Sequence, residues 1–258
     1  MEIEEGYMPF LGHKTYYRIV GEASKDKKPL LLLHGGPGST HNYFEVLDRV
    51  AWETGRQVIS YDQIGCGNSY LEGHPELWTL ETWMDELIAL REFLHLDRFH
   101  ILGQSWGGML IIAYLIEKKP QGICSAIISS GHASSSLWAS EQHRMIALMD
   151  EEDQQAIRQA ELTGNFEDPA YLRANDRFMT LHCASTDENS TECLTRPKRS
   201  GKEAYLYGWG PNEAVARSMH EGISGSRWEL MEGARHMCFV DRHEDYCRIL
   251  ESWLEEHD

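Results

Sequence analysis

The chain has 258 residues, of which 41% are hydrophobic and 25% are charged, a composition typical of a globular protein with a sizeable core. Its 24 Lys and Arg residues stand against 41 Asp and Glu residues. The resulting net charge of −17 argues against nucleic acid as a partner, because phosphate binding needs a basic surface. No apolar run approaches the about 20 residues of a membrane-crossing helix, so no membrane partner is expected.

The first residues are acidic and lack the basic start and apolar stretch of a secretory signal. Six cysteines without a C-x-x-C pair indicate reduced thiols rather than a disulfide scaffold. Both features predict a cytoplasmic protein, and neither bears on its oligomeric state.

Short apolar runs alternate with longer amphipathic segments, a pattern typical of βαβ units and a parallel sheet. The expected strands are residues 14–20, 29–33, 57–61, 99–102, 124–129 and 227–231, the first with the alternation of an edge strand. The expected helices are residues 42–52, 80–95, 106–118 and 243–255. In the second helix, Trp83, Leu87 and Leu90 recur at three- and four-residue spacing, which predicts a stripe that faces the core.

Residues 134–207 follow another pattern, helical and polar without any β-branched run. A segment of this kind between two sets of strands is typical of a helical cap inserted into an α/β core. We therefore expect a core made of residues 1–133 and 208–258, with residues 134–207 as the cap. The predicted fold class is α/β, with a mostly parallel sheet and helices on both faces.

The strongest motif is Gly103-Gln104-Ser105-Trp106-Gly107, which fits G-x-S-x-G between an expected strand and an expected helix. A nucleophile at such a sharp turn strains the backbone, and side chains at the two glycine positions would clash. The motif therefore predicts Ser105 as a catalytic nucleophile at the carboxyl edge of the sheet.

Residues 34–38, His-Gly-Gly-Pro-Gly, directly follow the buried strand expected at 29–33. A loop of small residues at a strand end can bring backbone N–H groups within about 3 Å of a developing oxyanion. We expect the N–H groups of Gly36 and Trp106 to form this oxyanion hole. The alternative is a glycine-rich turn that only reverses the chain.

The general base is expected after the last strand, and His236 alone among thirteen histidines occupies that position. His34 and His41 flank the glycine loop and are interpreted as structural. His95, His100 and His257 are expected at the surface.

Four segments together resemble the proline iminopeptidases of the α/β-hydrolase superfamily. They are residues 34–42, 61–69 (Y-D-Q-I-G-C-G-N-S), 103–108 and 208–213 (G-W-G-P-N-E), and the similarity spans nearly the whole chain. The resemblance implies an α/β-hydrolase fold and release of N-terminal proline from short peptides and amides. It also implies Ser105 as nucleophile, His236 as base, and no metal or cofactor.

By the same resemblance, Glu213 matches a cap glutamate that binds the α-ammonium group of the substrate. An exopeptidase must recognise a free cationic amine, and a partly desolvated carboxylate suits that task. The alternative is that Glu213 caps the helix expected after it, since acidic residues favour helix N-termini.

One part of the family pattern is missing from this sequence. The triad acid should follow a strand between the cap and His236, yet residues 184–226 contain no β-branched apolar run. A segment of some tens of residues, with one sheet strand, is expected to be deleted, so the triad acid is unknown. Glu213, Glu232 and Asp241 are the substitutes considered. Loss of this carboxylate costs about 10⁴-fold in kcat in serine proteases.

The predicted function is therefore a serine aminopeptidase of prolyl type, impaired by loss of the triad acid. A general aminoacyl amidase or esterase is one alternative. The other is a catalytically silent homologue that binds peptides or amines without cleaving them.

Overall fold

The computed structural model describes residues 2–132, 134–184, 186–205 and 225–258. Its sheet has six strands in the order β1-β2-β4-β3-β5-β6, with β1, β2 and β4 antiparallel and β4, β3, β5 and β6 parallel. The strands are β1 (Ile3–Phe10), β2 (His13–Val20), β3 (Leu30–Leu33), β4 (Val58–Tyr61), β5 (Phe99–Gln104) and β6 (Ile123–Ser129).

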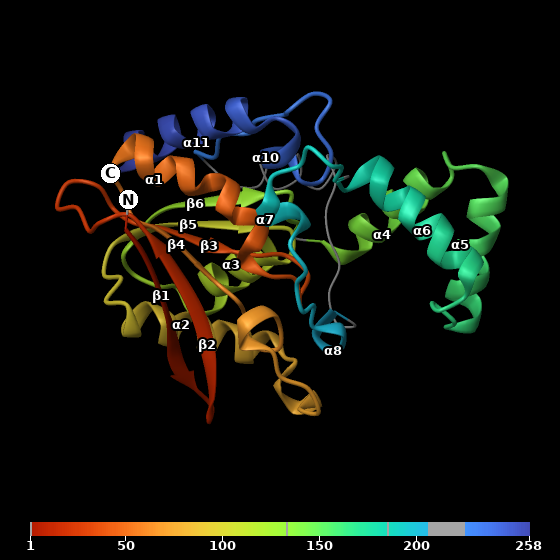
Figure 1. Cartoon of the computed structure of the whole chain (residues 1–258), viewed down its shortest axis with the longest axis horizontal. Helices are drawn as coiled ribbons and strands as arrows, with labels where there is room; N and C mark the ends of the chain where they lie inside the picture. Colours follow the sequence, from red (N-terminus) through yellow and green to blue (C-terminus); the bar gives the residue numbers. More distant parts are fainter. Residues whose placement is uncertain (1, 133, 185, 206–224) are drawn as a thin grey trace.

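Helices cover both faces of this sheet (Figure 1). They are η1 (His41–Leu47), α1 (Asp48–Thr54), η2 (Gly67–Ser69), η3 (Pro75–Leu77), α2 (Leu80–Phe93), α3 (Trp106–Glu117), α10 (Cys238–Asp241) and α11 (His243–His257). Side chains alternate along a strand, so Leu31 and Leu33 pack with α2 and α3, while Leu30 and Leu32 pack with α1 and α11. The α/β-hydrolase architecture expected from the sequence is present.

Five of the six expected strands are present within about two residues of their expected bounds. The sequence did not indicate β1, which forms the edge of the sheet and places β2 in its interior. The strand expected at residues 227–231 is wrong, because this segment has no strand pairing. Among the described residues, β6 is therefore the last strand of the sheet on that side.

The segment expected to form the cap is helical where the structure describes it. Its helices are α4 (Ser135–Ile146), α5 (Glu151–Thr163), α6 (Pro169–His182), α7 (Glu192–Thr195) and α8 (Lys202–Tyr205). Helices α4, α5 and α6 project to one side of the sheet in Figure 1. Helices α5 and α6 bury a small cluster of their own around Ile157 and Ala174. We propose residues 134–207 as the cap on this basis.

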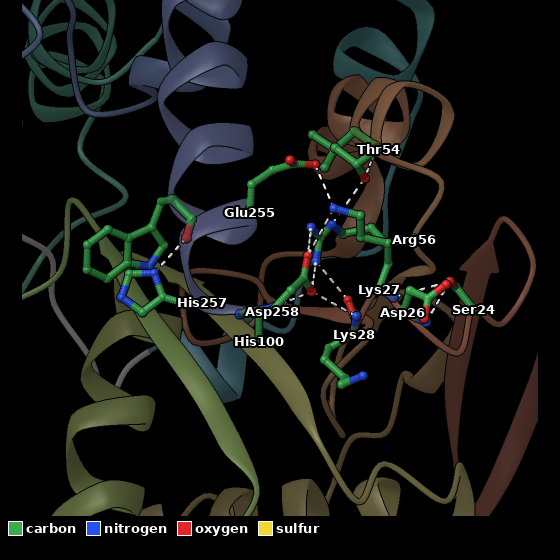
Figure 2. Close-up of polar contacts among 12 residues, drawn as sticks. Ser24, Asp26, Lys27, Lys28, Thr54, Arg56, His100, Glu255, His257 and Asp258 are labelled. Carbon is green, nitrogen blue, oxygen red and sulfur yellow. Dashed lines mark hydrogen bonds and ion pairs between the residues drawn. The ribbon is translucent and has the colours of Figure 1, made fainter.

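The amino end of the parallel strands is closed by an ionic cluster at the end of α11 (Figure 2). The Asp258 carboxylate binds the Arg56 guanidinium at 3.0 and 3.2 Å, the backbone N–H of Lys28 at 2.9 Å and Nε2 of His100 at 3.3 Å. His100 is fully buried, so the surface position expected for it is wrong. The cluster fixes α11 against the sheet.

No helix in the described part of the chain is both long and apolar enough to span a membrane.

Candidate active site

Ser105 occupies a strained turn between β5 and α3. Its φ of 55° and ψ of −120° lie in a region that side chains other than glycine rarely adopt. A Cβ atom at Gly103 would lie 2.3 Å from the backbone of Gly107, and one at Gly107 would lie 2.1 Å from the carbonyl oxygen of Leu33. The two glycines of the motif are therefore required by the close packing of this turn, as the sequence predicted.

The glycine loop lies directly against this turn. A Cβ atom at Gly35 would be 3.0 Å from Cβ of Ser105, and Gly36 has a φ of 119°. The backbone N–H of Trp106, in the first turn of α3, has no acceptor four residues earlier within the helix. Gly36 thus follows the residue that contacts Ser105, and Trp106 is the chain neighbour of Ser105. The oxyanion hole formed by their N–H groups stays a prediction.

The loop is held by a buried network built on His34. The backbone N–H of Gln63 donates to Nε2 of His34 (3.0 Å), and Nδ1 of His34 donates to the carbonyl of Gly35 (2.8 Å). Burial lowers the pKa of His34 to about 4, so the ring is neutral. The Gln63 side chain also donates to the His34 carbonyl and accepts from Nε1 of Trp106. Through these contacts, Gln63 of the Y-D-Q segment supports both the glycine loop and the turn at Ser105.

His236 lies at the same place but contacts the neighbour of Ser105. The hydroxyl of Tyr43 donates to Oε1 of Gln104 (2.9 Å), which turns the amide nitrogen of Gln104 toward Nε2 of His236 (3.0 Å). The ring nitrogen that faces Gln104 is therefore an acceptor, and the proton of the neutral ring resides on Nδ1. No hydrogen bond joins the side chains of Ser105 and His236, so the catalytic contact expected from the sequence is not made here.

No carboxylate among the described residues contacts His236. Burial lowers its pKa to about 4, and no negative group in the described part of the chain opposes that shift. Asp241 binds the backbone and the guanidinium of Arg235, and Glu232 is exposed. Glu213 lies outside the described residues.

Backbone hydrogen bonds of His236 explain why its ring faces Gln104 and not Ser105. Its N–H donates to the carbonyl of His182 (3.0 Å), and the N–H of Met237 donates to the carbonyl of Cys183 (3.1 Å). His236 is thus held by the end of α6, whereas the expected arrangement would place it after a strand of the sheet. The described residues before His236 form no such strand.

Comparison with known proteins agrees with this architecture. A family model described as the alpha/beta hydrolase fold matches residues 28–170. The proline iminopeptidase of Clostridioides difficile (strain 630) is 51% identical over the whole of both chains, and that of Lactobacillus helveticus (strain DPC 4571) is 49% identical over the whole of both. The chain belongs to the proline iminopeptidase family.

Solved structures extend the comparison to the fold of this family. A proline iminopeptidase from Mycobacterium smegmatis superposes with a TM-score of 0.81 at 26% identity over 98% of each chain. The structure titled VinJ superposes with a TM-score of 0.88 at 24% identity over 99% of each chain, which shows a shared fold.

The alignments with the curated family members also show how much this chain lacks. Each extends over 294 positions, whereas the chain has 258 residues, so at least 36 aligned positions have no counterpart here. This size agrees with the deleted segment of some tens of residues expected from the sequence.

A cavity of about 1420 Å³ opens beside Ser105, Gly36 and His236. It exceeds the about 300–1,000 Å³ of an ordinary small-ligand pocket. Its walls come from the glycine loop, β6, α3, α4, α6, α11 and residues 225–231. Two aromatic residues of the cap helices, Trp138 and Phe178, line this cavity.

Sequence reasoning missed two side chains that organise this site. Tyr43 accepts from the N–H of Gly35 (2.6 Å) and fixes the amide of Gln104, which in turn holds His236. Gln104 is the variable residue of the G-x-S-x-G motif, and Tyr43 follows the glycine loop by only a few residues. Their closeness to the motifs was a signal, although spacing alone does not show which atoms meet.

No group of three or more possible metal-ligating side chains occurs among the described residues.

Proposed function

We propose that this chain is a serine aminopeptidase that releases N-terminal proline, or another small residue, from short peptides and amides through an acyl-enzyme. The strained turn that presents Ser105 next to the glycine loop, in a chain of this family, is the observation that carries the proposal. The six free cysteines are in keeping with a cytoplasmic site of action.

The proposed reaction begins when Oγ of Ser105 attacks the first peptide carbonyl and its proton passes to Nε2 of His236. The N–H groups of Gly36 and Trp106 stabilise the negative oxygen. The C–N bond then breaks as His236 returns the proton to the leaving amine, and a prolyl ester remains on Ser105. Water attacks this ester with His236 as base, which releases proline and restores the serine. Glu213 is proposed to bind the substrate ammonium.

The first step requires His236 to exchange Gln104 for Ser105, because the Gln104 amide is the one described hydrogen-bond partner of its Nε2. No carboxylate of the described residues stabilises the imidazolium that forms. We therefore expect turnover well below that of a complete triad, by as much as about 10⁴-fold.

The test combines a chromogenic proline anilide with a serine-directed phosphonate and intact mass measurement. We expect slow hydrolysis and one adduct at Ser105, both lost in Ser105→Ala. A matched control is Ser129→Ala, because Ser129 lines the same cavity but contacts Cys238. An adduct without turnover would indicate a triad too impaired for catalysis, and the absence of both signals from folded protein would refute the peptidase proposal.

The comparisons do not favour the two alternatives. Equal rates on proline and alanine anilides would support a general amidase. Peptide binding without any adduct would support a silent homologue.

A further inference from the structure

The cap returns to the core through a basic segment that crosses the glycine loop. The backbone N–H of Gly67 donates to the carbonyl of Arg199, and that of Gly201 donates to the carbonyl of Gly38, both at 2.8 Å. A Cβ atom at Gly38 would lie 2.4 Å from the carbonyl oxygen of Gly201. Residues 198–201 are thus fixed against the loop that borders Ser105.

The three cations of this segment differ in their partners. Arg196 forms an ion pair with Glu45 at 2.7 Å, and the guanidinium of Arg199 stacks on the ring of Tyr70 at 3.3 Å. Lys198 has no hydrogen bond or ion pair with any described residue. Its ammonium lies 5.7 Å from the ring centre of Tyr43, which provides only a weak cation–π contact.

The acidic side chain that acts on the charge of Lys198, Asp62, already has other partners. One oxygen of Asp62 accepts from the backbone and the ring of His41 at 2.8 Å, and the other accepts from the N–H of Asn68 at 2.8 Å. Lys198 is an exposed residue, and the protein around its ammonium lowers its pKa by partial desolvation. Since no described residue pairs with this ammonium, it is available for a charge-assisted hydrogen bond to an anionic ligand.

The location of Lys198 indicates which anion could reach it. Lys198 lines the same cavity as Ser105 and Gly36. The Tyr43 ring lies beside Lys198, and its hydroxyl forms hydrogen bonds with Gly35 and Gln104. Lys198 is therefore on the side of Ser105 that the glycine loop occupies. In a dipeptide, the terminal carboxylate is only two bonds from the scissile nitrogen and stays close to the reacting carbonyl. A substrate ammonium would be repelled from this place.

We propose that Lys198 binds the C-terminal carboxylate of the leaving residue and makes this chain selective for dipeptides over the corresponding amides. This inference rests on the peptidase function proposed above. It assigns the two ends of the substrate to opposite charges, with the carboxylate at Lys198 and the ammonium at the acidic residue proposed above. The local cation is needed because the net charge of −17 of the protein disfavours the carboxylate end of a zwitterionic dipeptide.

The experiment compares prolyl-alanine with prolyl-alaninamide, which differ only in the terminal charge. In Lys198→Gln, kcat/KM for the dipeptide should fall about tenfold more than kcat/KM for the amide, the size expected for one charge-assisted hydrogen bond. Lys198→Arg should restore most of the preference. Arg199→Gln is the matched control, since it removes the adjacent cation, and it should keep the wild-type ratio of the two substrates.

Binding to Ser105→Ala protein, measured by titration calorimetry, separates this inference from the peptidase proposal. We expect the additional Lys198→Gln change to weaken dipeptide binding about tenfold and to affect amide binding less. If the chain binds the dipeptide through Lys198 but hydrolyses neither substrate, the carboxylate site stands and the peptidase proposal fails. If hydrolysis occurs and the ratio of the substrates is the same in Lys198→Gln as in the wild type, the carboxylate site is refuted and the peptidase proposal stands.

Discussion

Two histidines at opposite ends of the same sheet show what the catalytic end lacks. His100 lies near the amino end of β5, where Nδ1 contacts the hydroxyl of Ser125 (2.8 Å) and Nε2 contacts the Asp258 carboxylate (3.3 Å). His236 lies beyond the carboxyl end of β5, and among the described residues its ring forms a hydrogen bond only with Gln104. Burial lowers the pKa of both rings, but only for His100 does a described carboxylate oppose the shift.

The comparison teaches that a catalytic site depends on more than its set of side chains. The side chains of Ser125, His100 and Asp258 are linked by hydrogen bonds in the order of a catalytic triad, yet Ser125 lies within strand β6 and His100 is fully buried. Ser105 has the strained turn, the glycine loop and the cavity that this trio lacks, but no described carboxylate contacts His236. Catalysis is therefore expected only at the carboxyl end of the sheet, where His236 has fewer hydrogen-bond partners than His100 has at the amino end.

The largest expected effect is the loss of activity in His236→Ala. General acid–base catalysis contributes about 10²–10⁴-fold, so hydrolysis of proline anilide should fall by that factor. The matched control is His182→Ala, because His182 lines the same cavity and binds the backbone of His236 only through its carbonyl. If both variants lose activity equally, His236 is not the base.

A smaller effect is expected at the other end of the sheet, on stability instead of activity. Asp258→Asn leaves the fully buried guanidinium of Arg56 without its counter-charge, so the free energy of unfolding in urea should fall by about 3 kcal/mol. Glu255→Gln removes a half-exposed partner of Lys27 and should cost less than about 1 kcal/mol. Equal losses in the two variants would show that the buried cluster does not anchor α11.

Added formate should partly replace the missing acid. The cavity beside His236 is large enough to admit a small carboxylate, which would stabilise the imidazolium that forms during catalysis. We expect saturating formate to raise kcat about tenfold over chloride at the same ionic strength, with no effect on His236→Ala. An unchanged kcat would indicate that the absent acid does not limit the rate.

Local sequence signals predicted most of the fold, and contacts between distant segments explain where they failed. The four leucines of β3 and the glycines around Ser105 could be recognised because the types of adjacent residues indicate burial and backbone strain. Strand β1 was missed because only Met8 and Phe10 of its residues are buried. His100 was placed at the surface because its partner Asp258 is distant in the sequence.

The error at residues 227–231 has a different cause. A strand needs a neighbour, and the residue pattern within one segment does not show whether another strand pairs with it. The same reason accounts for His236, whose slot in the sequence was recognised while its contact with Gln104 was not. A deletion changes the partners of the residues that remain, so motifs on either side stay recognisable after their geometry has shifted.

The smallest expected effect is the response of activity to pH between 5 and 7. A base must be neutral to accept a proton, and with a pKa of about 4 His236 stays neutral through this range. We expect kcat/KM for proline anilide to vary less than about twofold from pH 7 to pH 5 and then to fall about tenfold per unit below pH 4. A carboxylate partner would raise this pKa, so formate should move the acid limb toward the ordinary value of about 6.5.

The depressed pKa of His236 also lowers folding stability as the pH falls from about 6.5 to 4, because the unfolded chain binds the proton more readily. Circular dichroism at each pH separates that loss from the titration of the base, and an acid limb near 6.5 without formate would mean that His236 already has an acidic partner.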